Sequence, residues 1–265
     1  MTDLFEYQFI TNALFVMLML SVTAGIIGTY IVARRMVFVA GGITHASFGG
    51  IGIAYYLGLS PIGGALTFAI LTALGIEALG TRGKVREDSA IAILWSLGMA
   101  VGVIFMFLTP GYSQNLMGFM FGDVLSVSQA DIVAVGIMAL LTTISAIVFY
   151  RPIMYTAFSP SYASVTGWNT RLISMLIAVF VAVALVLAIK AVGIILVLSL
   201  FTIPQAIANV FVKKMGLMML MSVGVSILGS IAGLAIAFSL DLPVGATITS
   251  ALAIALLIIK VFDKK

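Results

Sequence analysis

The residue best suited to chemistry is His45, the only histidine in a chain of 265 residues that is 63% hydrophobic and 8% charged. An imidazole ligates divalent transition metals, and a histidine within an apolar membrane stretch generally marks a site or a pathway. If residues 40–52 form a helix, Gly41 and Gly49 lie one turn to either side of His45 and leave room around it. We therefore expect either a metal contact or a packed histidine bonded to a backbone carbonyl.

A second row of small residues on the same helix, formed by Gly42, Ala46, Gly50 and Ala54, is typical of a face that another helix approaches closely. His45 is thus predicted to lie in a tightly packed helix.

Asp241, which is followed by Pro243 and Gly245, is the second candidate. At such a helix junction the carboxylate could cap the helix or contribute a ligand at the outer mouth of a pathway. The chain has no cysteine, which excludes disulfide bonds and thiolate metal sites. Neither His45 nor Asp241 identifies a function alone.

Motifs of catalysis are missing from the sequence. It contains no G-x-x-x-x-G-K-[ST], no G-x-S-x-G and no H-E-x-x-H pattern. We expect a chain that is not an enzyme, that binds no nucleotide in the P-loop manner and that holds no permanently bound cofactor.

The elements that must position these residues are membrane helices. A mean hydropathy of +1.27 and long continuous apolar runs predict a single all-α polytopic membrane domain over residues 1–265. The predicted spans are 8–33, 36–59, 62–80, 89–108, 129–150, 171–189, 191–212, 216–240 and 246–262. The division between the sixth and seventh spans rests on residues 190–193 alone, so an eight-helix alternative with one broken or re-entrant segment stays open.

The distribution of charge predicts the orientation. With the N-terminus outside and the C-terminus in the cytoplasm, all thirteen lysines and arginines except Lys190 fall at or inside the inner boundary. The acidic residues Asp123 and Asp131 fall outside. The net charge of +4 therefore reflects topology and not a nucleic-acid partner.

The inner loop over residues 151–170 carries the signals of a short helix. Ser159 is suited to the N-cap, Pro160 to the first helical position and Gly167 to the position after the C-cap. Phe158 and Trp168 would hold this helix at the inner face of the membrane, either as an ordinary interfacial helix or as a docking site for a cytoplasmic partner.

Several stretches, in order along nearly the whole chain, resemble the permease subunits of ABC importers for zinc, manganese and ferrous iron. They are Arg34-Arg35-Met36 followed by Gly-Ile-Thr-His45-Ala, Arg86-Glu87-Asp88-Ser-Ala-Ile91 with Gly98-Met99-Ala100-Val-Gly102, Phe121-Gly122-Asp123-Val-Leu-Ser-Val-Ser, Phe158-Ser-Pro160 with Ala163 and Gly167, Val192-Gly-Ile-Ile-Leu-Val197, Ile203-Pro204 and Leu242-Pro-Val-Gly-Ala-Thr-Ile248.

The resemblance implies a homodimeric permease in a prokaryotic cytoplasmic (inner) membrane, served by separate cytoplasmic ATP-binding subunits and an extracytoplasmic metal-binding protein. The transported ion would be zinc first, then manganese or iron. His45 and Asp241 would be metal contacts in the pathway. The residues that couple to the ATPase would be Phe158, Ser159, Pro160, Ala163 and Gly167.

Two positions depart from the family pattern. Gly41 stands where the family usually has an aspartate one turn before its histidine, and Ser159 where aspartate is common. Because a lone imidazole binds a divalent ion poorly, Asp241, a second copy of His45 or water would have to complete the ligand shell. The alternatives are a permease for metal chelates such as cobalamin or siderophores, and an ATP-independent secondary transporter or channel.

Overall fold

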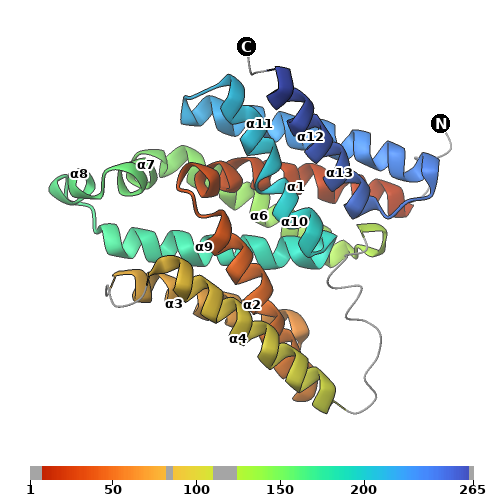
Figure 1. Cartoon of the computed structure of the whole chain (residues 1–265), viewed down its shortest axis with the longest axis horizontal. Coiled ribbons are helices and arrows are strands. Elements are labelled where there is room, and N and C mark those ends of the chain that lie inside the picture. Colours follow the sequence, from red (N-terminus) through yellow and green to blue (C-terminus); the bar gives the residue numbers. More distant parts are fainter. Residues whose placement is uncertain (1–7, 82–85, 110–123, 263–265) are drawn as a thin grey trace. The chain divides into compact units, whose positions relative to one another are not determined.

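The computed structural model describes residues 8–81, 86–109 and 124–262, and every regular element in these ranges is helical. The elements are α1 (Gln8–Ala33), α2 (Val37–Tyr56), α3 (Pro61–Thr81), α4 (Glu87–Leu108), η2 (Val124–Ser126), α6 (Gln129–Val148), α7 (Tyr150–Phe158), α8 (Pro160–Val165), α9 (Thr170–Val192), α10 (Ile194–Leu200), α11 (Ile203–Phe211), α12 (Met215–Leu240) and α13 (Val244–Phe262) (Figure 1).

Within the described ranges, nine helical segments are long and apolar enough to cross a membrane, which confirms the predicted all-α polytopic fold. The predicted end of the sixth span is wrong by a few residues. Lys190 lies in the last turn of α9, and the helix ends instead at Val192, just before Gly193, whose φ of +80° only glycine adopts readily. The seventh span, Ile194–Phe211, is broken into α10 and α11.

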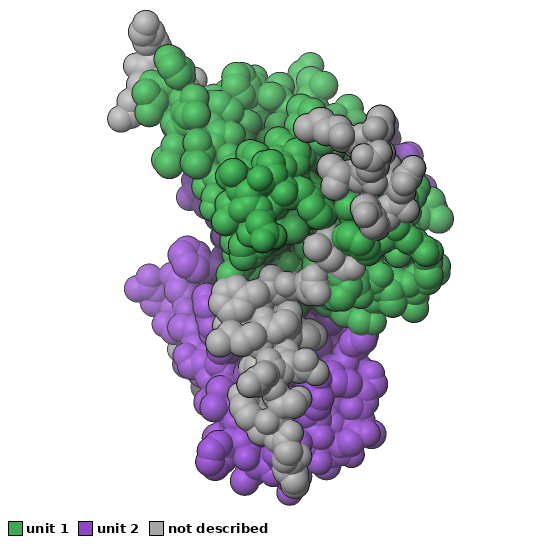
Figure 2. Space-filling model, turned by 90° about the vertical axis from the view of Figure 1, so that its right-hand side faces the viewer, with its two compact units in different colours: residues 1–33, 115–146, 187–265 green, residues 34–114, 147–186 purple. Residues whose placement is uncertain are grey.

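The chain divides into two compact units, each assembled from separated stretches of sequence (Figure 2). The first comprises residues 1–33, 115–146 and 187–265, and the second comprises residues 34–114 and 147–186. His45 and the predicted coupling loop belong to the second unit, and Asp241 belongs to the first.

In the second unit, α2 packs against both α3 and α4 through its small residues. A Cβ added to Gly50 would lie 2.0 Å from the carbonyl oxygen of Gly64 in α3, and one added to Gly52 would lie 2.5 Å from that of Gly102 in α4. These backbones touch directly, as small residues allow in membrane helices. The predicted small-residue row is confirmed, with Ala46 facing α4 and Gly50 facing α3.

In the first unit, α12 packs against α1 on one side and α13 on the other. Gly229 and Gly233 of α12 make room for Leu252 and Ile248 of α13, so this GxxxG pair serves helix packing. On the side of α1, the Thr29 hydroxyl donates to the carbonyl of Gly25 at 2.6 Å and lies 3.3 Å from the Ser222 hydroxyl.

The break in the seventh span is bridged by Gln205, a fully buried residue of α11. Its Nε2 donates to the carbonyl of Leu200 at the end of α10 (3.1 Å) and to that of Ala24 in α1 (2.7 Å). A carbonyl freed by a helix break needs such a partner inside a membrane. The amide fits because Gly28 has no side chain, and a Cβ there would lie 2.4 Å from Nε2.

The contact between α2 and α3 leads to a prediction at two neighbouring glycines. A Cβ at Gly64 would lie 2.2 Å from the carbonyl oxygen of Gly50, whereas one at Gly63 would meet only Ser60 at 3.8 Å. Gly64→Ala must push two backbones apart and should destabilise the protein by about 1–3 kcal/mol. Gly63→Ala is the matched control and should be neutral or stabilising by up to about 1 kcal/mol, because alanine favours the helix. Unfolding of the purified variants in detergent measures both, and equal stability would contradict the packing described.

Candidate functional site

His45 lies in the middle of α2, with its side chain partly buried. Its Nδ1 is buried and has no hydrogen-bond partner among the described residues, so the carbonyl-bonded alternative does not describe that nitrogen. The neighbouring hydroxyl of Thr44 is also buried without a partner. No described protein group therefore holds the imidazole through its Nδ1.

The imidazole stacks against Trp95 of α4. The two rings are stacked, with centroids 4.4 Å apart and planes 8° apart. The sequence does not point to Trp95 as this partner, because a tryptophan in an apolar helix gives no sign of which neighbour it faces.

Asp241 is the C-cap residue of α12 and adopts a left-handed conformation, with φ 53° and ψ 47°. The next residue, Leu242, donates its N–H to the carbonyl of Ala237 at 2.9 Å, which closes the helix end. The side chain of Asp241 is exposed. Its backbone thus serves as the cap, while its carboxylate stays available to a ligand.

A complete metal centre is not assembled within the part of the chain that the structure describes, where no three His, Asp or Glu side chains cluster. Asp123, which the sequence analysis places outside, lies beyond the described residues. His45 and Asp241 belong to different units, so each remains a separate prediction of a ligand.

The predicted inner loop forms two short helices, α7 and α8, joined at Ser159. Pro160 begins α8 as predicted, and Gly167 has a φ of +87°. The N–H groups of Gly167 and Trp168 donate to the carbonyls of Ser164 (3.1 Å) and Ala163 (3.0 Å). This pair of bonds is a Schellman motif, so the predicted C-terminal stop is confirmed.

Two details of this loop differ from the prediction. The hydroxyl of Ser159 makes no capping bond, and only its carbonyl accepts, from the N–H of Ala163 at 3.0 Å. The helix α7 differs from the predicted end of the fifth span at residue 150, because the chain continues as a helix through Pro152. Proline lies here in the first turn of α7, where its missing N–H costs nothing.

The coupling candidates differ in their exposure. Phe158 is 57% exposed, whereas Ala163 is fully buried. Tyr155 of α7 and Tyr162 of α8 meet edge to face, with ring centroids 5.0 Å apart. Arg34, from the turn between α1 and α2, donates from its guanidinium to the carbonyl of Ala157 at the end of α7. The loop is therefore helical and is hydrogen-bonded to the turn that precedes α2.

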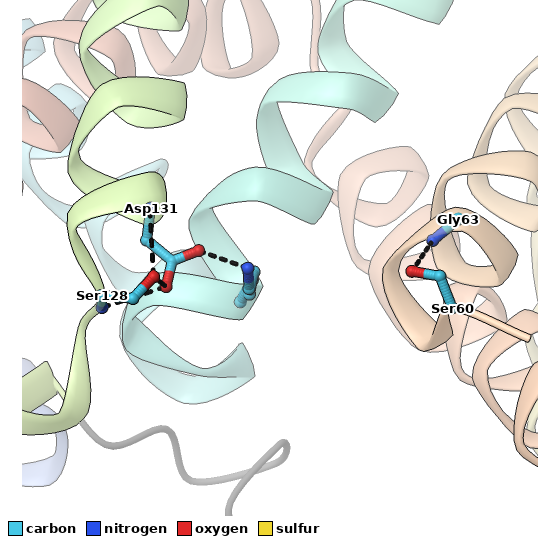
Figure 3. Close-up of polar contacts among 5 residues, drawn as sticks. Ser60, Gly63, Ser128 and Asp131 are labelled. Carbon is cyan, nitrogen blue, oxygen red and sulfur yellow. Dashed lines mark hydrogen bonds and ion pairs between the residues drawn. The ribbon is translucent and has the colours of Figure 1, made fainter.

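Lys190, the one basic residue predicted to lie outside, forms an ion pair with Asp131 at the start of α6. Figure 3 shows Asp131 beside Ser128. The same carboxylate accepts from the hydroxyl of Ser128 at 2.6 Å and from its N–H at 3.1 Å. Lys190, the exception to the charge rule, is thus neutralised by Asp131.

In the second unit, the close-up in Figure 3 shows the Ser60 hydroxyl facing the N–H of Gly63 at the start of α3, at a distance of 3.5 Å.

Comparison with known proteins identifies the family. The chain matches the model of the ABC 3 transport family over residues 6–263. It belongs to the ABC 3 transport family. As a member, it is a multi-pass permease subunit of a bacterial inner-membrane ABC importer, and it is not itself a catalytic enzyme.

Two relatives and one solved structure illustrate the breadth of the match. A "Probable metal transport system membrane protein" of Chlamydia pneumoniae is 40% identical over 235 residues, covering 86% of this chain and 80% of the relative. The manganese transport system membrane protein MntC of Halalkalibacterium halodurans is 32% identical over 247 residues, covering 93% and 84%. PsaBC from Streptococcus pneumoniae in complex with Fab superposes with a TM-score of 0.86 at 26% identity, covering 97% of this chain and 93% of that chain.

The ion pair of Lys190 with Asp131 can be tested by substitution. Its side chains are 33% and 13% exposed, so Lys190→Met should cost about 1–2 kcal/mol, between the values for exposed and buried pairs. The matched control is Asp88→Asn, which removes the pair with Arg86, whose side chains are 86% and 80% exposed, and should change stability by less than about 0.5 kcal/mol. Thermal unfolding of both variants in one detergent gives the comparison, and a Lys190→Met protein as stable as wild type would contradict it.

Proposed function

We propose that this chain is the permease subunit of an ATP-driven importer for a divalent transition metal, manganese first, then zinc or iron(II). The observation that carries the proposal is its membership of the ABC 3 transport family over almost its full length. Support for a metal comes from the names of its relatives, and those names favour manganese ahead of zinc. Imidazole and carboxylate ligands suit all three ions, so the ligand types alone do not choose among them.

The ion would pass His45 in α2 and Asp241 at the end of α12. The support is chemical, since the Nδ1 of His45 has no hydrogen-bond partner among the described residues and Asp241 is exposed. One imidazole holds a divalent ion weakly. The remaining ligands at His45 would come from a second copy of the chain in a homodimer or from water. A loosely held ion suits a pathway, because the ion must also leave.

The energy would come from separate cytoplasmic ATP-binding subunits, since this chain has no P-loop motif. With the N-terminus outside, α7 and α8 lie on the cytoplasmic face and receive those subunits through Phe158, Pro160 and their neighbours. ATP binding and hydrolysis would drive alternating access, and an extracytoplasmic binding protein would deliver the ion. The bond from Arg34 to Ala157 supports this role, because it ties the loop to the helix that carries His45.

Uptake by cells tests the pathway. In a strain that lacks its own manganese importer and expresses the partner subunits, His45→Ala should lower manganese uptake about tenfold or more, since losing one good ligand costs at least about 1.4 kcal/mol. Gly224→Ala, at a position with nothing within 4 Å of an added Cβ, is the control and should transport normally. Normal uptake by His45→Ala at equal membrane abundance would remove His45 from the pathway.

The same assay distinguishes the rival functions. Competition by free zinc and iron(II) ranks the three ions. Competition by cobalamin or a siderophore, with none by free ions, would favour the chelate permease. Transport by the purified chain in vesicles without ATP or partners would favour a secondary transporter or channel.

Capture of the ATP-binding subunit tests the coupling loop. Phe158 is more than half exposed, so Phe158→Glu should leave the fold intact and weaken capture at least about tenfold, as expected when an aromatic anchor is lost from an interface. Phe158→Leu keeps an apolar side chain at the same place and should lose much less. Equal capture of the ATP-binding subunit by Phe158→Glu and wild type would show that the partner docks elsewhere.

A further inference from the structure

We propose that Trp95 is a positioning residue for His45, holding the imidazole through its indole face and stabilising it when it carries a divalent cation. The inference rests on the proposed function, and it names a residue on α4 that this function requires. It follows from the stacking geometry, the unpartnered ring nitrogen and the packing of α2 against α4.

The ring geometry is specific. Centroids 4.4 Å apart with planes 8° apart place the imidazole flat against the indole in an offset stack. The face of an indole is electron-rich and attracts a cation. An imidazole that binds a metal ion carries part of its charge, so the stack strengthens when the ion arrives.

The ring nitrogens explain why such a partner is needed. A histidine that ligates a metal usually donates its second ring N–H to a carboxylate or carbonyl, which fixes the ring. His45 has no such partner, because its Nδ1 is buried without a hydrogen bond among the described residues. The ring face takes over this orienting task, and Nε2 is left as the nitrogen that meets the ion.

The indole of Trp95 also lies beside Gly41, one turn before His45 in α2. A Cβ on Gly41 would lie 3.6 Å from Cζ3 and 3.9 Å from Cη2 of the indole, which is ordinary contact. The six-membered ring therefore covers the position from which a second side chain of α2 could reach the ion. On these two helices, the metal contact is a single imidazole backed by an aromatic ring.

The packing of the helices holds the stack in register. Gly98, three residues after Trp95, lies against Ala46, the residue after His45, and a Cβ on Gly98 would be 2.5 Å from the Cα of Ala46. One turn further along α2, a Cβ on Gly49 would lie 2.8 Å from the carbonyl oxygen of Gly98. With the two backbones in contact here, the indole cannot slide along the imidazole without separating the helices.

Manganese binding to the full-length chain in nanodiscs tests the proposal. Free Mn²⁺ gives an electron paramagnetic resonance signal that is lost on binding, which yields a Kd for each variant. Trp95→Leu keeps apolar volume without a π face and should weaken binding that depends on His45 about tenfold, whereas Trp95→Phe should stay within about twofold of wild type. Thermal unfolding of each variant shows whether it is folded.

A second readout needs no change at residue 95. The chain has two tryptophans, so Trp168→Phe leaves Trp95 as the only indole. Paramagnetic Mn²⁺ should quench its fluorescence with the same Kd, and His45→Ala in that background should abolish the quenching.

Equal binding by Trp95→Leu and Trp95→Phe would overturn the proposal, and so would binding at His45 that leaves Trp95 fluorescence unchanged. Absence of any binding that depends on His45 would overturn it as well. The uptake assay decides the transport function separately, because wild-type uptake does not depend on either readout.

Discussion

The second unit depends on one constraint, the direct contact of helix backbones at glycine. Helices surrounded by lipid gain little from the hydrophobic effect when they associate, so close packing has to hold them together. Helix α2 contacts α3 where Gly50 meets Gly64, and it contacts α4 where Gly52 meets Gly102. The register of α2 and α4 then decides which side chains meet. The stack of His45 on Trp95 is a product of that register.

The first unit uses small residues as well, but it adds polar bonds where the membrane helix is interrupted. The break between α10 and α11 leaves carbonyl groups without helical partners. The buried side-chain amide of Gln205 donates to one of them, that of Leu200, and also to the carbonyl of Ala24 in α1. The Thr29 and Ser222 hydroxyls meet across α1 and α12. The bonds of Gln205 connect the break between α10 and α11 to α1, in a medium that offers no water to replace them.

The membrane spans could be predicted from the sequence because hydropathy and length are sufficient for that purpose. The helix end at Gly167 could be predicted because a positive φ after the C-cap selects glycine. The end of α9 was misplaced, since a lysine can continue a helix and only Gly193 ends it. Which helix faces pack against each other could not be predicted from the sequence. Trp95 faces His45 because of contacts some fifty residues apart in sequence, and no pattern within α2 or α4 alone reports which faces meet.

The ion pair of Asp131 with Lys190 has a direction built into it. Asp131 is in the first turn of α6, at the positive end of that helix macrodipole, and Lys190 is in the last turn of α9, at the negative end of its own. Each charge is favoured by its helix before the two meet. Exchanging the two residues would keep the pair but set both charges against their dipoles. The chain direction of the two helices therefore decides which of them should carry the acid and which the base. The observed arrangement, with Asp131 on α6 and Lys190 on α9, is the favourable one.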